Sequence, residues 1–435
     1  MTNHVNTDLV QHIAALPLID THEHLHKEAK YVQDGPDVLA DLFGMYIGDE
    51  LVVAGAPLSA VERLLDASDP DIEARWSGVE AAWQLCQYSG YGEAVRYMAK
   101  VVYDIDTLTL EAIEAAGPRN QAIRQPGERL RLLRDVANLD HVQVDDFVWP
   151  CLPDASGPSF FLYDFSWVDF VSVRFDVNAL EAETGVTTTN LKTLKQAMEA
   201  LTAKYAPVAI AMKIQHAYYR TLAWSPRDDA DAEKALQKYL AGEPLSEAER
   251  LCLGDWNLER GIEMAIKYHL PIKIHTGFLA GHQRYFTHPD QTRAGHLAPL
   301  LAYFPEATFV LMHIAYPYSD ELIAIAKHFP GVYLDMCWAW SINPYHAADF
   351  VRRALHGLPL NKLFAFGGDC VWPTEVVGFA AQSRRWLTCA LQLEITDAYL
   401  SEAQAIQVAT RMMQTNQRAV FDIEGTRSAI AALGV

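Results

Sequence analysis

The chain has 435 residues, of which 50% are hydrophobic and 21% are charged, a composition typical of a globular protein with a large buried core. Its formal net charge of -20 argues against nucleic acid as a partner, because a phosphate backbone needs a basic surface. The sequence also lacks the roughly 18 consecutive apolar residues that indicate a membrane span. Neither nucleic acid nor a membrane is therefore an expected partner.

The start of the chain and its cysteines predict where the protein works. Residues 1–8 contain neither a basic segment nor an apolar one, so we expect no secretory signal. The six cysteines are far apart and form no CxxC pair, which indicates reduced thiols rather than a disulfide framework or a zinc knuckle. A cytoplasmic location is the expectation.

The first predicted strand ends in two histidines, within the run Leu18-Ile19-Asp20-Thr21-His22-Glu23-His24. Side chains alternate between the two faces of a strand, so His22 and His24 point the same way and Glu23 points to the other face, where we expect a structural role. Two adjacent imidazoles at a strand end are suited to holding one divalent metal ion.

Apolar runs of strand type recur along the chain and alternate with helix-period segments. They are Pro17 to His22, His141 to Val144, Phe170 to Phe175, Val208 to Ile214, Pro271 to His275, Thr308 to His313, Gly331 to Asp335 and Leu363 to Asp369. This alternation predicts an α/β fold with a parallel sheet, and eight strands close a (β/α)8 TIM barrel. An open doubly wound sheet is the alternative, but no GxGxxG follows the first strand.

Two helical insertions are predicted within one domain of residues 1–435. The larger follows the first strand, over approximately residues 25–136, and the smaller follows the fourth strand. Insertions after strand ends build a lid over the active face of a barrel. A decorative subdomain or an oligomer contact is the other interpretation, and a homo-oligomer stays open.

Metal-ligand residues stand at the ends of several predicted strands. Beyond the first histidine pair, the fifth strand ends in His275, the sixth in His313 and the eighth in Asp369, while the fourth carries Lys213. All of these ends meet at one mouth of a barrel. Histidine and carboxylate ligands around an ion with one open position form a catalytic site, so we predict a metal-dependent enzyme.

The order HxH, Lys, His, His, Asp along successive strands resembles the amidohydrolase superfamily. The segments Lys213 to Arg220, Ile274 to Phe278 and His313 to Tyr318 are similar to its second amidohydrolase group. That group includes the barrel domain fused to glutamine-synthetase-like domains, and it is more distantly similar to uronate isomerases and metal-dependent decarboxylases.

The resemblance implies a metal held by His22, His24, His275 and Asp369. It further implies that His313 binds a second metal or acts on the substrate, and that Lys213 is a candidate for a carboxylated bridge between two metals. One ion is favoured over two. Zinc is the expected ion and manganese the alternative, because such ligands suit several metals.

The expected reaction is hydrolysis of an amide or a lactone in a small carboxylate-bearing molecule. A metal-activated water attacks, Asp369 acts as general base and then acid, and His313 polarises the carbonyl or stabilises the oxyanion. Arg220 and Arg174 are candidate clamps for the substrate carboxylate, and Trp338 is a candidate pocket wall. Isomerisation of a uronate or decarboxylation on the same scaffold is the alternative, followed by a catalytically silent barrel that serves binding or assembly.

Overall fold

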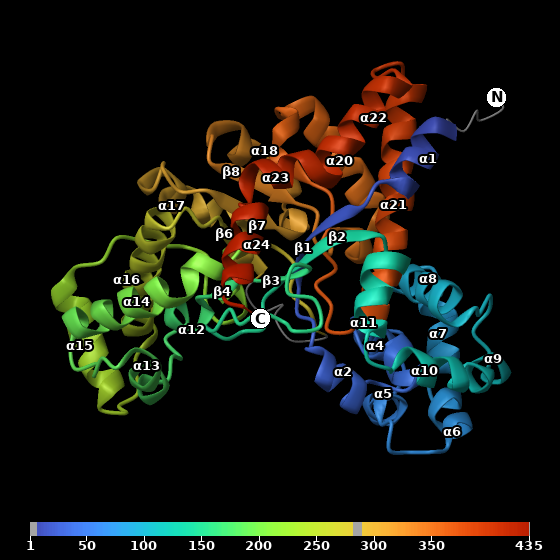
Figure 1. Ribbon diagram of the computed structural model, residues 1–435, viewed down its shortest axis with the longest axis horizontal. Helices are drawn as coiled ribbons and strands as arrows, with labels where there is room; N and C mark the ends of the chain where they lie inside the picture. Colours follow the sequence, from blue (N-terminus) through green and yellow to red (C-terminus); the bar gives the residue numbers. More distant parts are fainter. Residues whose placement is uncertain (1–6, 282–288, 435) are drawn as a thin grey trace.

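The core of the protein is a set of neighbouring parallel strands (Figure 1). The computed structural model describes residues 7–281 and 289–434. Within these ranges the strands are β1 (Leu18–Glu23), β2 (Leu139–Val144), β3 (Phe161–Tyr163), β4 (Phe165–Ser166), β5 (Met212–Ile214), β6 (Ile272–His275), β7 (Phe309–Met312), β8 (Val332–Asp335) and β9 (Leu363–Phe364). Each bonded pair of neighbours is parallel.

The two short strands β3 and β4 act as one strand, interrupted only at Asp164. The Asp164 N–H donates to the Val144 carbonyl at 2.8 Å, and the Phe165 N–H donates to the Ala211 carbonyl on the other side at 2.8 Å. This combined strand therefore pairs with β2 through β3 and with β5 through β4.

Main-chain hydrogen bonds also join β1 to the segment that follows β9. The Thr21 N–H donates to the Phe366 carbonyl at 3.0 Å, and the Asp369 N–H donates to the His22 carbonyl at 3.1 Å. The described residues thus form a closed barrel of eight strands, which confirms the predicted (β/α)8 fold. The same hydrogen bonds bring His22 of β1, and His24 just after β1, next to Asp369.

The predicted third strand is wrong, because Phe170 to Phe175 forms helix α12 (Val168–Val171) and a turn. Both phenylalanines are buried, and neither lies in a strand of the sheet. Phe170 contacts Trp167 at 4.3 Å between ring centroids, and Phe175 contacts Tyr239 at 4.9 Å. A short apolar run looks the same in a buried strand and in a buried helical turn, so the sequence pattern does not separate them.

Helices between the strands cover the outside of the barrel. The main ones are α14 (Leu191–Tyr205), α16 (Glu247–Lys267), α17 (Ala298–Tyr303), α18 (Ser319–His328), α20 (Pro344–Gly357) and α21 (Pro373–Thr396). Asn190 caps α14 and Ser246 caps α16 in capping boxes, which satisfy the free N–H groups of the first turn. No described helix is both long and apolar enough to cross a membrane.

Two groups of helices flank the barrel, at the left and at the lower right of Figure 1. The group on the left includes α13 (Val177–Thr184) and α15 (Asp229–Leu240), which precedes α16 after β5. The group at the lower right follows β1 and is called the β1–β2 insertion below. Its helices are α2 (Glu28–Asp34), α3 (Val38–Phe43), α4 (Ile47–Val53), α5 (Leu58–Leu65), α6 (Ile72–Ser77), α7 (Glu80–Cys86), α8 (Gly90–Tyr103), α9 (Leu110–Ala115), α10 (Gly117–Ile123), α11 (Glu128–Arg131) and a final turn, Leu132–Val136.

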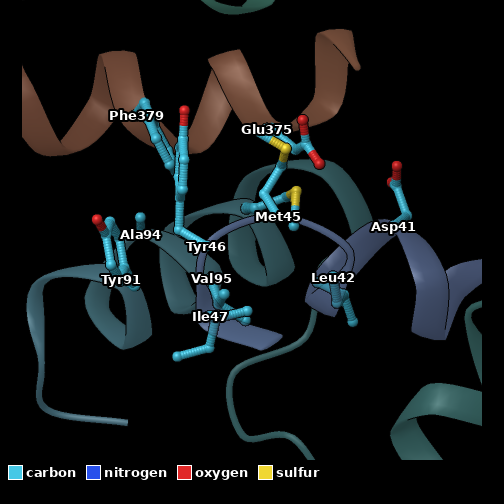
Figure 2. A pocket seen from close by; sticks show the side chains of 11 residues that line it. Asp41, Leu42, Met45, Tyr46, Ile47, Tyr91, Ala94, Val95, Glu375 and Phe379 are labelled. Atoms are coloured by element: carbon cyan, nitrogen blue, oxygen red, sulfur yellow. The ribbon is translucent and has the colours of Figure 1, made fainter. Parts of the chain in front are cut away.

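The β1–β2 insertion packs against α21, with a small cavity at the contact (Figure 2). The cavity holds about 20 Å³, room for about one water molecule, between Tyr46, Tyr91 and Phe379 among other side chains. Two buried carboxyl groups, Asp41 and Glu375, also line it, and burial raises the pKa of both. The insertion is therefore joined to the barrel by packed side chains.

Candidate metal centre

Three predicted ligands, His22, His24 and Asp369, bring their ligand atoms together at the mouth of the barrel. Nε2 of His22 lies 3.3 Å from Nε2 of His24 and 3.1 Å from Oδ1 of Asp369. Nε2 of His24 lies 3.2 Å from the same Oδ1. Among the described residues, this trio is a group suited to hold a metal ion.

The protonation of the two rings leaves lone pairs facing the centre of this triangle. Nδ1 of His24 lies 2.6 Å from the main-chain oxygen of Asp145. Because a carbonyl only accepts, Nδ1 carries the proton and Nε2 presents its lone pair. Nζ of Lys213 lies 3.0 Å from Nε2 of His22, and an ammonium only donates, so this Nε2 also presents its lone pair. Two lone pairs and a carboxylate oxygen repel one another unless a cation lies between them.

The size of the triangle fits a metal ion. A tetrahedral ion with bonds of roughly 2.0–2.1 Å has ligand–ligand edges of roughly 3.3–3.4 Å. The edges of 3.1, 3.2 and 3.3 Å are close to this value. Three protein ligands leave the fourth position open, as in catalytic metal sites.

A buried ion pair between Lys273 and Asp164 lies next to the triangle. Nζ of Lys273 lies 2.8 Å from both carboxylate oxygens of Asp164 and donates to the Thr21 carbonyl at 2.6 Å. Burial by itself raises the pKa of Asp164, but the charge and hydrogen bond of Lys273 together with the contact to His22 outweigh burial and lower it. Asp164 is therefore an ionised carboxylate beside His22, an arrangement that orients a metal-ligating imidazole.

The charge states in the triangle also suit metal binding. Burial, and then the positive charge of Lys213, lowers the pKa of His22, so its ring stays neutral. Oδ1 of the buried Asp369 lies against both Nε2 atoms, so this carboxylate carries its negative charge when a metal cation lies between them. Neutral imidazoles and an ionised carboxylate are the ligand forms that a metal needs.

Lys213 reaches the site from β5. Its Nζ lies 3.0 Å from Nε2 of His22 and donates to Oε1 of Gln215 at 3.0 Å. The amine is thus within reach of the ligand group, as a bridging role requires.

His275 lies beside the trio but its ring is turned toward another partner. Its Nε2 donates to the Phe278 carbonyl at 2.8 Å, so its lone pair is on Nδ1. Its ring centroid lies 4.2 Å from that of His313. The structure does not bring His275 into the group of converging ligand atoms.

His313 is a buried acceptor. Its Nδ1 lies 3.0 Å from the Cys337 carbonyl, so the proton is on Nδ1, and the buried Nε2 has no partner among the described residues. Burial lowers the pKa of His313 to about 3, which keeps the ring neutral. The predicted role in polarising a carbonyl needs a donor, and this tautomer offers none. The structure instead favours His313 as a metal ligand or as an acceptor for a substrate hydroxyl.

Trp338, the candidate pocket wall, lies beside these histidines. Its ring centroid lies 5.5 Å from His313 and 6.4 Å from His275. On its other side the ring packs on Tyr46 of the β1–β2 insertion, with centroids 4.4 Å apart. Its buried indole N–H has no hydrogen-bond partner among the described residues.

The two predicted arginine clamps differ in their surroundings. Arg174 is exposed, and its guanidinium lies over the ring of Tyr219 at 4.3 Å. Arg220 is buried, donates to Oδ1 of Asp255 at 2.5 Å and donates to the Ala223 carbonyl at 2.8 Å. The prediction of Arg220 as a substrate clamp is not supported, because its guanidinium already holds a carboxylate of α16.

We expect Arg220→Met to lower the free energy of unfolding by about 3 kcal/mol, because it leaves Asp255 buried without one of its ion-pair partners. Arg174→Met is the matched control and should change stability by less than about 1 kcal/mol, the size of an exposed cation–π contact. Urea denaturation of both variants measures this. Unchanged stability in Arg220→Met would contradict the structural role.

The comparison with known families is decisive for the class of this chain. The model of a family described as Amidohydrolase matches residues 178–421, more than half of the sequence.

The chain belongs to the amidohydrolase family.

Solved structures with a similar fold match nearly the whole of this amidohydrolase chain. A uronate isomerase from Thermotoga maritima has a TM-score of 0.80 and 16% identity, and the match covers 97% of this chain and 98% of that one. A glucuronate isomerase from Caulobacter crescentus has a TM-score of 0.76 and 16% identity, with 97% and 95% covered. At these identities the likeness shows a shared fold.

A curated relative matches over a shorter stretch. Protein fluG from Emericella nidulans is 27% identical over 180 residues, which are 39% of this chain and 20% of fluG. This chain therefore aligns with only about a fifth of that relative's length.

Several residues that contact the candidate ligands of the amidohydrolase site were not predicted from the sequence. Asp164 and Lys273 support His22, and each is a charged residue inside an apolar run, which was a usable signal. Phe147 stacks on the His24 ring at 4.2 Å between centroids, from the loop after β2. The Tyr46 hydroxyl donates to the Asp369 carbonyl at 2.5 Å from the β1–β2 insertion. Neither aromatic residue has a local sequence pattern that reveals its role.

Proposed function

We propose that this amidohydrolase is a metal-dependent hydrolase that cleaves a C–N or C–O bond, in an amide or a lactone of a small carboxylate-bearing molecule. The observation that carries the proposal is the convergence of two histidine lone pairs and the Asp369 carboxylate at 3.1–3.3 Å. One zinc ion is the proposed occupant, with manganese as the alternative, because nitrogen and carboxylate ligands at tetrahedral spacing suit zinc.

The proposed chemistry divides between the ion and the side chains. A divalent ion polarises a substrate carbonyl and lowers the pKa of a bound water. Asp369, ionised and buried, accepts the proton of the attacking water and returns it to the leaving nitrogen or oxygen. Trp338 walls the site and excludes water, and His313 accepts a hydrogen bond from a substrate hydroxyl through Nε2.

Arg174 is the proposed partner of the substrate carboxylate. Its exposed guanidinium lies over the Tyr219 ring at 4.3 Å, and we propose that its N–H groups donate to the substrate carboxylate. Tyr219 follows Tyr218, whose ring contacts His275 at 4.8 Å between centroids, so the arginine belongs to the same mouth of the barrel. With one ion in the site, Lys213 remains an amine and not a carboxylated bridge.

Isomerisation of a uronate is the second candidate reaction. It is favoured by the likeness to two uronate-type isomerase structures over 97% of the chain, and by the acceptor character of His313, which suits a hydroxyl-rich substrate. Isomerisation moves protons within the substrate, whereas hydrolysis adds a water to it.

Mass balance separates the two reactions. The zinc-loaded protein is incubated with a panel of lactones, amides and uronates, and the products are analysed by mass spectrometry. A ring-opened lactone heavier by one water, or two amide fragments whose masses add up to the amide plus one water, supports the hydrolase, and a ketose of unchanged mass supports the isomerase. A zinc-loaded protein that converts none of these classes would contradict both candidates.

A further inference from the structure

The main chain around Asp369 is held in an uncommon conformation. Asp369 has a φ of 61°, in the left-handed region that residues other than glycine adopt rarely. Its own N–H donates to the His22 carbonyl at 3.1 Å. Such a conformation costs energy and persists only where the surroundings fix it.

Glu23 fixes this loop from both sides of Asp369. Its Oε1 accepts from the Gly368 N–H at 2.7 Å, and its Oε2 accepts from the Cys370 N–H at 2.6 Å. A Cβ at position 368 would lie 2.3 Å from Oε1 of Glu23, so only glycine allows this approach. Glu23 is fully buried.

Tyr46 fixes the same loop from the β1–β2 insertion. Its hydroxyl donates to the Asp369 carbonyl at 2.5 Å. The Tyr46 ring is itself fixed between Trp338, at 4.4 Å between centroids, and Tyr91, at 5.2 Å. Figure 2 shows the two tyrosines side by side below α21.

We propose that Glu23 and Tyr46 are positioning residues, which hold the Asp369 loop so that its carboxylate completes the ligand triangle. Four main-chain groups of this loop are hydrogen-bonded to Glu23, Tyr46 or His22: the N–H groups of Gly368, Asp369 and Cys370 and the carbonyl of Asp369. The β1–β2 insertion thereby becomes part of the metal centre through Tyr46. This inference rests on the metal centre proposed above.

Tyr46→Phe tests the inference with Tyr91→Phe as the matched control. Both variants remove one hydroxyl from the same aromatic cluster, but the buried Tyr91 hydroxyl has no partner among the described residues. The zinc dissociation constant is measured by chelator competition, and the visible absorption spectrum is recorded with Co²⁺. We expect Tyr46→Phe to weaken zinc binding by about 10–100-fold, as for other partners that orient metal ligands, and to change the Co²⁺ spectrum. Tyr91→Phe should match the wild type.

Glu23→Gln replaces one of the two accepting oxygens by an NH₂ group, which cannot accept from the facing main-chain N–H. We therefore expect a loss of zinc affinity at least as large as in Tyr46→Phe. If Glu23→Gln does not fold, Tyr46→Phe still decides the question. Wild-type binding together with unchanged affinity and spectrum in Tyr46→Phe would overturn the positioning role. A wild-type protein that binds neither ion would instead overturn the metal centre itself.

Discussion

Asp369→Asn is expected to lower the turnover rate by about 10²–10⁴-fold, the usual contribution of a general acid–base group. Asparagine keeps the shape of the side chain and the main-chain bonds to Glu23, but it removes the negative charge and the proton acceptor. Oδ1 of the buried carboxylate lies 3.1 and 3.2 Å from Nε2 of His22 and His24, so its negative charge is the property that the variant tests. The rate is measured on the substrate identified by mass balance, together with the metal content.

Asp349→Asn is the control for this variant, because Asp349 is exposed on α20 and pairs only with Arg353 there. It should keep the wild-type rate. Full activity of Asp369→Asn with metal still bound would contradict the role of Asp369 in proton transfer.

His24→Ala is expected to weaken metal binding by more than about 100-fold, beyond the 10–100-fold loss typical of residues that only support a ligand. The variant removes one of three converging ligands. His24 is the better choice than His22, because its side chain is 12% exposed and that of His22 is 0% exposed. The smaller packing loss makes unfolding a weaker explanation for the result.

His328→Ala is the control, since His328 is exposed at the end of α18. Zinc affinity of both variants is measured by chelator competition, with circular dichroism to check the fold. A folded His24→Ala protein with wild-type affinity would contradict the proposed ligand set.

The sequence predicted the barrel and the closeness of His22, His24 and Asp369 for a simple geometric reason. The ends of parallel strands meet at one mouth, so His22, His24 and Asp369 had to lie near one another once the strands were found. These are local patterns read directly along the chain.

The errors come from contacts that no local pattern contains. Arg220 looked like a substrate clamp because its partner Asp255 lies 35 residues further along the chain, on α16. The donor role predicted for His313 does not fit its tautomer, which depends on the Cys337 carbonyl beyond β8. Tyr46 was missed because only packing of the β1–β2 insertion brings it to Asp369.

The most direct test of the central claim is the metal content of the purified protein, measured by elemental mass spectrometry beside the His24→Ala variant. The converging ligand triangle predicts about one equivalent of a divalent transition metal per chain, lost in His24→Ala. Two equivalents would contradict the single-ion site and implicate Lys213 as a bridge. A wild-type chain that holds no metal after incubation with zinc and manganese would contradict the metal centre and the enzyme proposed from it.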